Sequence, residues 1–408
     1  MSYRPFEVTG LELEYPVVSR ADLSVQVRVE ELFRKLHGRP TSDLEIDGAG
    51  FSNELAAHVF ELKTVEPQRS LVAAEEILQR GVETANRALG EEWDARLLPT
   101  GMHPFMRPGE TELWPRAGRQ IYRAYDRVFG ISGHGWLNVQ SCHVNLPFGS
   151  EAETMRLHTA VLCLLPYLPA LAASSPIYEG RLGPAVDNRL VFYRGNQARV
   201  PEAAGRVVPE HVTSFRQYRR EVLEPIYSRL RQIPEAERLR HEWVNSRGAI
   251  LRFWRRALEI RVLDVQECVR MDVAIAVFVR GVLRHLVERL EQGELAVPPH
   301  DVLVEDLTRA IDRGTAAAVA APHLGPEGRT ARDVLLSLLD AAETATPRGE
   351  REYLPLVARR LKEGNLSEQI RRQVENVPEG ERQQAIRTLY GHLADNLTHN
   401  RPYVPMAA

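Results

Sequence analysis

Four short segments of the chain place charged or metal-ligating residue types at every second position of an otherwise apolar run. They are residues 11–15, 58–64, 142–146 and 258–262. Side chains of a β-strand alternate between the two faces of its sheet. Each segment therefore predicts a strand with one apolar and one polar face. In a shared sheet, one side would carry several carboxylates, a histidine, an amide and an arginine.

Helical and irregular stretches are expected around these strands. Apolar residues recur at helical spacing in several segments, which Gly- or Pro-rich stretches separate. A turn at 47–50 between two strand-like runs predicts a hairpin. The expected helices cover 24–37, 70–93, 119–129, 151–173 and 211–232, the expected loops cover 99–115 and 177–210, and almost all of the chain after 270 is expected to be helical. The pattern indicates an α+β fold with antiparallel strands and a helical C-terminal part.

Composition narrows the class of protein. The length of 408 residues fits two ordinary domains, or one large domain with a helical extension. The net charge of −3 gives no electrostatic reason to expect nucleic acid or an anionic membrane as a partner. The three cysteines lack metal-ligand spacing and lie in apolar surroundings, so buried reduced thiols are expected. No signal peptide is visible, and the most apolar run, 160–173, is too short to span a bilayer. We expect a cytoplasmic protein.

The paired acids are the first candidates for metal ligands. Glu12 and Glu14 share a strand face and are suited to bind one hard cation, or two neighbouring ones, through oxygen. A solvent-facing strand with alternating charge explains the same pattern and is the commoner case. The same two explanations apply to Glu61. Glu54 is either a further acid of the site or a surface residue.

Two further strands add a histidine and an arginine. His143, beside Asn145, could contact a metal or a phosphate, or it could be a core histidine whose nitrogens are satisfied. Glu259 and Arg261 form either a surface ion pair of little energy or a metal ligand beside a phosphate-binding guanidinium. Carboxylates gathered so densely repel one another unless cations lie among them. Taken together, the face indicates a metal-dependent site for an anion, most simply a phosphate.

Several common motifs are absent from the sequence. It contains no Gly-x-x-x-x-Gly-Lys-Ser/Thr loop, no Gly-x-Gly-x-x-Gly after a strand, no His-Glu-x-x-His and no Gly-x-Ser-x-Gly. A protein that uses ATP without these motifs must hold the phosphates in another way. Magnesium on a carboxylate-lined sheet is one such way.

Six segments, in order along residues 7–285, resemble the glutamate–cysteine ligase family 2, carboxylate–amine ligases of the glutamine synthetase-like superfamily. Residues 10–15 (Gly-Leu-Glu-Leu-Glu-Tyr) resemble the opening Gly-x-Glu-x-Glu-aromatic strand, and 60–64 the second acidic strand. Residues 101–105 match the Gly-x-His-Pro-Phe loop. Residues 140–147 resemble the central histidine strand, with Asn145 where many members have a second histidine. The last two matches are the Leu-Pro…Ser-Ser-Pro…Gly…Arg pattern of 165–189 and the Glu-x-Arg-x-x-Asp-x-Gln segment within 257–268.

The resemblance implies a glutamine synthetase/guanido kinase-like fold, a curved antiparallel sheet flanked by helices. It implies a ligase core over 1–285 and a helical extension over 286–408 that packs on the core. It also implies an enzyme that uses ATP and Mg²⁺, with Mn²⁺ as an alternative, to join a carboxylate to an amine through an acyl phosphate. The carboxylate is typically the γ-carboxylate of glutamate. Its partners would be ATP and amino-acid or amine substrates, and a homo-oligomer stays open.

The resemblance also implies roles for individual residues. The acids that would hold the metal are Glu12, Glu14, Glu61 and Glu259. Arg261 would stabilise the transferring phosphoryl group, with Glu259 and His143 as catalytic neighbours. The nucleotide contacts would be His143, Asn145 and Arg261, and the substrate contacts Arg189, His103 and Ser175. Arg189 could equally be a surface residue of its loop, and His103 a packing residue beside Pro104.

Three functions stay open on the sequence alone. The first is a ligase for glutamate and cysteine, and the second is a ligase of the same fold for another amino acid, amine or peptide. The third is a degenerate, nucleotide-binding scaffold protein. The intact set of acids with Arg261 argues against the third, because a degenerate protein has no reason to keep acids on matching strand faces.

Overall fold

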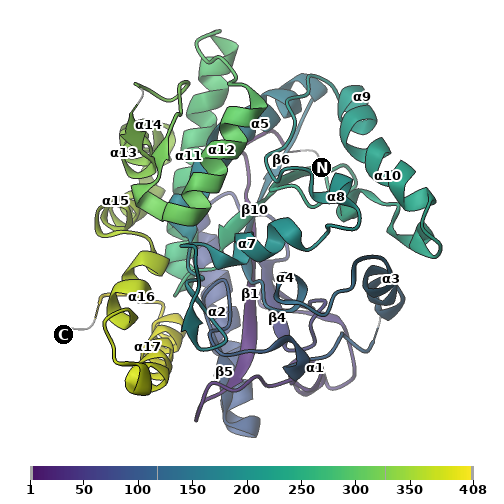
Figure 1. Ribbon diagram of the computed structural model, residues 1–408, viewed down its shortest axis with the longest axis vertical. Helices are drawn as coiled ribbons and strands as arrows, with labels where there is room; N and C mark the ends of the chain where they lie inside the picture. The colour runs from purple at the N-terminus through teal and green to yellow at the C-terminus, as the bar shows by residue number, and fades with distance from the viewer. Residues whose placement is uncertain (1–2, 117, 327, 406–408) are drawn as a thin grey trace.

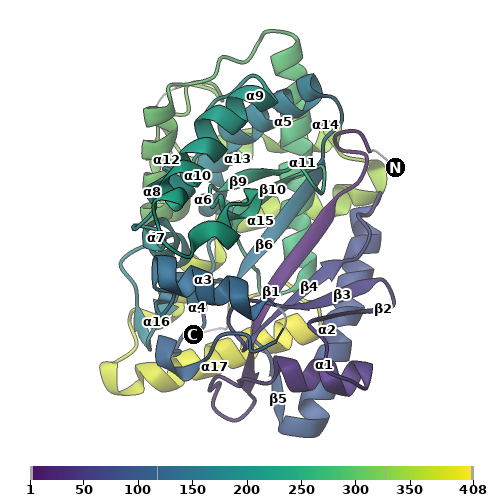
Figure 2. The same ribbon diagram turned by 90° about the vertical axis from the view of Figure 1, so that its right-hand side faces the viewer.

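A computed structural model describes residues 3–116, 118–326 and 328–405 of the chain. Within them, the centre is an antiparallel sheet in the order β2-β3-β4-β1-β6-β10-β9, and β5 pairs with the end of β1 (Figures 1 and 2). Its strands are β1 (Gly10–Ser19), β2 (Asp43–Ile46), β3 (Ala49–Asn53), β4 (Val59–Thr64), β5 (Ala95–Leu97), β6 (Ser141–Pro147), β9 (Ala249–Arg252) and β10 (Ala257–Asp264). Two small ribbons lie apart from this sheet, β7 (Ile177–Tyr178) with β8 (Arg181–Leu182) and β11 (Ala318–Val319) with β12 (Arg329–Thr330).

All four strands predicted from alternation lie side by side in this sheet, as β4, β1, β6 and β10. The expected α+β class with an antiparallel sheet is confirmed. The predicted hairpin is also confirmed: β2 and β3 pair through a turn in which Asp47 and Gly48 have φ of 51° and 81°. Glycine adopts such values without strain, which explains its place at this turn.

The apolar face of the sheet packs on long helices. They are α2 (Leu71–Trp93), α5 (Glu151–Leu164) and α11 (Val269–Glu291). Leu13, Leu62, Val144 and Ile260 point to this side and are fully buried. Helix α2 approaches β4 so closely that a Cβ on Gly81 would lie 2.5 Å from Leu62 Cδ1. The alternation of the strands thus places one face in the core and leaves the other for a site.

A second group of helices stands over part of the polar face (Figure 2). They are α3 (Arg119–Phe129), α4 (His134–Leu137), α7 (Asn188–Gly195), α8 (Pro201–Ala204), α9 (Phe215–Tyr218) and α10 (Glu224–Arg231), with α1 (Val29–His37) and α6 (Leu168–Ala172) beside the sheet's ends. The expectation that 177–210 is a loop was wrong. A short ribbon and helices α7 and α8 occupy it, because Asp187 caps α7 by accepting a hydrogen bond from the Leu190 N–H at 2.8 Å.

The C-terminal third is helical, as predicted, and packs beside α11 on the side away from α9 and α10 (Figure 1). Its helices are α12 (His300–Arg313), α13 (Ala331–Ser337), α14 (Leu339–Ala345), α15 (Leu354–Glu363), α16 (Leu366–Val374) and α17 (Glu379–Thr398). Buried ion pairs join it to the core, Arg280 with Glu350 and Arg360 with Glu267. The division at residue 285 stays a prediction, and helix α11 runs through it.

The apolar run noted in the sequence lies inside the molecule. Within residues 3–116, 118–326 and 328–405, one helical stretch, Glu151–Ala172, is long and apolar enough to cross a membrane by composition, and 94% of its most apolar window is buried. A core helix passes the same test. All three cysteines are free and buried, as expected.

Candidate active site

The register of the central strands brings the predicted polar residues together on one face. Glu12 lies opposite His143, Glu14 opposite Glu61, and Glu259 opposite Asn145. Paired residues of neighbouring strands project to the same side of a sheet. The prediction that these acids, the histidine and the amide share a face is therefore confirmed.

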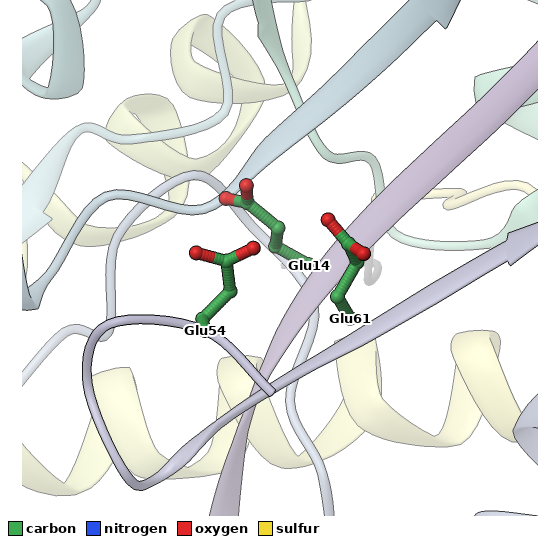
Figure 3. A group of neighbouring side chains, drawn as sticks. All are labelled: Glu14, Glu54 and Glu61. Carbon is green, nitrogen blue, oxygen red and sulfur yellow. The ribbon is translucent and has the colours of Figure 1, made fainter. Parts of the chain in front are cut away.

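Three carboxylates on this face form a tight cluster (Figure 3). Glu14, Glu54 and Glu61 each offer an oxygen within 4.8 Å of the other two. Glu14 accepts hydrogen bonds from the backbone N–H and the hydroxyl of Ser141, at 2.8 and 2.9 Å. Glu61 accepts hydrogen bonds from Lys63 Nζ at 2.8 Å and from Ser52 Oγ at 2.5 Å. We call Glu14, Glu54 and Glu61 the acid trio.

The pKa values of the three carboxyl groups in the acid trio are shifted in different directions. Burial, together with the charges of Glu14 and Glu61, raises the pKa of Glu54 well above its usual value. Burial also raises the pKa of Glu14. Burial alone would raise the pKa of Glu61 as well, but the ammonium of Lys63 outweighs it and lowers the pKa to about 2. Three carboxylates thus share one lysine, and a proton held on the trio relieves the repulsion.

This arrangement fits a hard divalent cation. Carboxylate oxygens are the ligands that Mg²⁺ and Mn²⁺ take in proteins, and a cation among the acids would replace the retained proton. Two of the predicted ligands, Glu14 and Glu61, belong to the trio. Glu54, which the sequence left open, is the third.

The other two predicted ligands already have nitrogen partners. Glu12 contacts His143 Nδ1 at 3.2 Å and accepts a hydrogen bond from Asn145 Nδ2 at 3.3 Å. Glu259 is 1% exposed and pairs with Arg252 at 2.6 Å and with Arg261 at 3.3 Å. The structure thus places both acids beside the acid trio but outside it. Their role as metal ligands stays a prediction.

His143 connects Glu12 with Glu14 of the acid trio. Its Nε2 lies 2.9 Å from Ser141 Oγ, and that hydroxyl donates to Glu14. Burial alone would lower the pKa of His143, but the hydrogen bond with Glu12 and the charge of Glu14 raise it overall. A chain Glu12–His143–Ser141–Glu14 therefore crosses the face, and a charged imidazole in it can offset the carboxylates on both sides.

Two cavities lie along this polar face. The larger, of about 720 Å³, is lined by Glu12, Lys63 and Asn145 together with apolar side chains. The smaller, of about 350 Å³, is lined by Glu14, His143 and other residues. Because Glu12 and Glu14 are neighbours on one strand face, as are Asn145 and His143, the cavities adjoin. Both volumes lie in the range of small-molecule sites.

Arg189 and Arg261 line the smaller cavity. Burial alone would lower the pKa of Arg261, but Tyr193 and Glu259 raise it, so the guanidinium stays charged. Arg189, predicted on a loop, is instead a buried residue of α7, 2% exposed. Its Nε donates to Asp264 Oδ1 at 2.5 Å, and Nη2 donates to the Arg261 carbonyl at 3.2 Å.

A β-bulge gives Asp264 this position. Ile260 pairs with Val144 and Leu263 with Cys142, so two residues of β10, Arg261 and Val262, oppose one residue of β6. The extra residue reverses the alternation of faces and puts Asp264 opposite Ser141. Simple alternation along the sequence does not show this reversal.

Two predicted substrate contacts have structural partners. His103 is 1% exposed; its Nδ1 accepts hydrogen bonds from the N–H groups of Phe105 and Met106, and its Nε2 lies 2.8 Å from the Leu23 carbonyl. These partners favour the packing alternative, and the substrate contact of His103 stays a prediction. Burial holds the pKa of His103 at about 4, so the ring is neutral.

Ser175 is also a structural residue in this arrangement. It is fully buried, outside the lining of both cavities, and its Oγ accepts a hydrogen bond from the Arg189 N–H at 3.1 Å. The loop of residues 101–105 packs closely against Asp264, because a Cβ on Gly101 would lie 2.4 Å from the Asp264 carboxylate. Ser175 thus helps to position Arg189, and its contact with a substrate stays a prediction.

The sequence patterns did not predict several residues of the site. Lys63 and Ser141 stand two positions from Glu61 and His143 on the same strands, so alternation could have found both. Glu54 follows β3 and lies outside any alternation. The aromatic side chains of the smaller cavity come from short helices on other parts of the chain and gave no local signal: Tyr122, Tyr125, Trp136, Tyr193 and Trp243.

The fold is shared with solved ligase structures. The chain superposes on a glutamate–cysteine ligase of Francisella tularensis in complex with AMP with a TM-score of 0.64 at 13% identity, covering 100% of this chain and 91% of that one. It superposes on a bifunctional glutathione synthetase of Pasteurella multocida with a TM-score of 0.57 at 16% identity, covering 95% of this chain and 53% of that one. The fold is therefore that of this class of ligases.

The sequence comparisons define the family. The model of glutamate–cysteine ligase family 2 matches residues 8–392. The chain is 40% identical over 92% of its length to an uncharacterised protein of Archaeoglobus fulgidus, covering 94% of that protein. It is 31% identical over 74% of its length to a protein of Ectopseudomonas mendocina provisionally named glutamate–cysteine ligase 2, covering 71% of it. The chain belongs to glutamate–cysteine ligase family 2, and by class it is a carboxylate–amine ligase.

Proposed function

We propose that the protein uses ATP and a divalent cation, Mg²⁺ or Mn²⁺, to activate the carboxylate of glutamate or a similar acid as an acyl phosphate. It then couples that acid to an amine. The observation that carries the proposal is the acid trio, gathered on one sheet face beside Arg261 where two cavities adjoin. The AMP in the Francisella tularensis structure supports a nucleotide substrate.

The larger cavity suits the nucleotide. Phe51, Phe148 and Trp254 offer apolar surface for a base, and Lys63 and Arg255 offer positive charge for phosphates. The γ-phosphate would then point along the face toward the acid trio. A divalent cation bound there would neutralise the carboxylates and hold phosphate oxygens against the sheet.

The smaller cavity would hold the reacting carboxylate. Arg261 is charged, and Glu259 at 3.3 Å orients its guanidinium, so it can stabilise the phosphoryl group as charge develops on it. In the first step a carboxylate oxygen bonds to the γ-phosphorus and the bond to the β–γ bridging oxygen breaks, releasing ADP. In the second step the amine nitrogen bonds to the acyl carbon, phosphate leaves, and the nitrogen gives up a proton.

Isotope transfer tests this proposal. Purified protein would be given ATP, Mg²⁺, glutamate labelled with ¹⁸O in its carboxylates, and pools of amines that include cysteine. Transfer of ¹⁸O into the released phosphate, dependent on an amine pool, is the expected result. ATP binding without stimulated hydrolysis in any pool would instead favour the scaffold function.

A variant pair connects the chemistry with the site. Arg261→Lys keeps the positive charge but loses the planar fork, so kcat should fall by about 100-fold or more. Arg313→Lys, at the exposed end of α12, should keep the kcat of the unmodified protein. Equal activity of the two variants would show that the planar guanidinium of Arg261 has no part in the mechanism.

A further inference from the structure

We infer that the amine substrate carries an aromatic ring, and that the smaller cavity binds this ring in preference to the side chain of cysteine. The inference rests on the proposed ligase function and specifies one of its substrates. It comes from the wall and the polar end of the smaller cavity, neither of which the proposed chemistry uses.

The wall of the smaller cavity away from the sheet is aromatic. Tyr125 of α3 is its centre, with ring centroids 5.4 Å from Trp136 of α4 and 5.7 Å from Trp243. Tyr122, one turn before Tyr125, lines the same wall. Aromatic rings attract other rings in edge-on or offset geometry, beyond the area that they bury. The wall thus offers several partners to a flat, apolar group.

Aliphatic side chains complete the wall and favour a ring over a cation. Leu55, Val59, Ile121 and Leu137 line the cavity with the aromatic residues. An aromatic cage can also bind an alkylammonium group. The carboxylates of this cavity, Glu14 and Glu54, belong to the proposed cation site, so a divalent cation bound there would repel such a charge, and the aliphatic neighbours would desolvate it. An uncharged ring suits the whole wall.

The opposite, polar end of the cavity has an unpaired amide. Gln140 lines the cavity and is fully buried, and neither its side-chain oxygen nor its nitrogen has a hydrogen-bond partner among the described residues. A buried amide without partners is rare in folded proteins. Gln140 therefore has one donor group and one acceptor group left for a ligand that reaches it.

The positions of the nucleotide and carboxylate sites indicate that the aromatic wall contacts the amine. The nucleotide in the larger cavity and the acid trio determine where the carboxylate is phosphorylated, next to Arg261. The amine then adds to one face of the planar acyl group, forming a tetrahedral intermediate from which phosphate leaves, so it needs room beside the carboxylate. The smaller cavity offers that room, and Tyr125 of α3 and Trp136 of α4 are among its lining residues.

Binding and turnover with four amines test the inference. The amines are 2-phenylethylamine, L-phenylalanine, L-cysteine and putrescine, measured by calorimetry with Mg²⁺ and ADP present and by kinetics with ATP and glutamate. We expect an aromatic amine to have a Kd and a KM at least 10-fold lower than those of cysteine and putrescine. A cysteine or putrescine affinity equal to or better than that of both aromatic amines overturns the inference.

Variants of the wall provide the second readout. Trp243→Leu keeps apolar volume but removes a ring, and we expect the KM for the aromatic amine to rise about 10-fold while the KM for ATP stays within twofold. Trp93→Phe, on α2 outside the lining of both cavities, is the matched control and should change neither. Equal effects of the two variants on the aromatic amine overturn the inference.

Different results would contradict the ligase function and the aromatic amine substrate. If an aromatic amine binds with the expected preference but no amine supports phosphate release, the ligase chemistry is wrong and the ring-binding cavity stands. If cysteine supports ¹⁸O transfer while no aromatic amine binds, the ligase function stands and the inference is overturned.

Discussion

Burial and neighbouring charges together shift the ionisation of Glu54. In the folded protein its pKa lies well above the usual 4.5, because of burial and the charges of Glu14 and Glu61. The folded state therefore binds more protons than the unfolded state once the pH rises above about 4.5. Stability falls with pH in that range, as far as the folded pKa of Glu54.

We expect Glu54→Gln to weaken this pH dependence. An amide resembles the protonated acid, so in EDTA the melting temperature of the variant should fall less between pH 5 and 8 than that of the unmodified protein. Asp187 and Asp272, whose pKa values burial also raises, contribute equally to both proteins. Parallel melting curves at every pH would show that Glu54 does not retain its proton.

Glu61 supports a second prediction at this scale. Glu61→Gln removes a carboxylate that Lys63 keeps ionised, so turnover should fall on the order of 100-fold and stabilisation by Mg²⁺ in thermal unfolding should be lost. Glu66→Gln, on an exposed residue after β4, is the control and should retain both. An Mg²⁺-induced shift that persists in Glu61→Gln would contradict the assignment of the acid trio as the cation site.

At the scale of elements, alternation predicted the strands well because each has one face in the core. Glu12, Glu14 and Glu61 could be assigned to one face from period two alone. Helix α7 was not predicted, because its capping depends on Asp187 and on Ser175, twelve residues earlier. Glu54 could not be placed from the pattern, since its position depends on the path of the chain after β3.

Helix α7 supports a prediction about Ser175. Ser175→Ala leaves the buried Arg189 N–H without its acceptor, so the free energy of unfolding in urea should fall by about 1–3 kcal/mol. Ser337→Ala, at the end of α13 on the protein's other side, is a hydroxyl-deletion control. Unchanged stability together with a raised KM for the carboxylate would instead support the direct substrate contact that the sequence predicted.

At the scale of the whole molecule, helices α12, α13, α14 and α15 of the C-terminal part belong to the same core as the sheet. The hydrophobic core runs without a break from Leu11 of β1 to Leu361 of α15. Glu267, fully buried, pairs with Arg360 and accepts a hydrogen bond from the Tyr403 N–H at 2.8 Å. Such partners lie about a hundred residues apart in sequence, which is why the packing of these helices could not be predicted from local patterns.

Breaking this link should destabilise the entire chain. Arg360→Ala leaves Glu267 as a buried, unpaired charge, and we expect a loss of about 3–5 kcal/mol in the free energy of unfolding. Urea unfolding followed by circular dichroism and by tryptophan fluorescence should show one shared transition. Two separate transitions would indicate instead that residues 1–285 and 286–408 unfold as independent domains.

The bulge in β10 determines which face the end of this strand presents to the site. With Val262 present but no bulge, Val262 would pair with Cys142, and every residue after it would turn to the opposite face. Asp264 would then point into the core and release Arg189. We therefore expect the lineages of this family that keep both Arg189 and the length of this strand to keep the bulge opposite His143 as well.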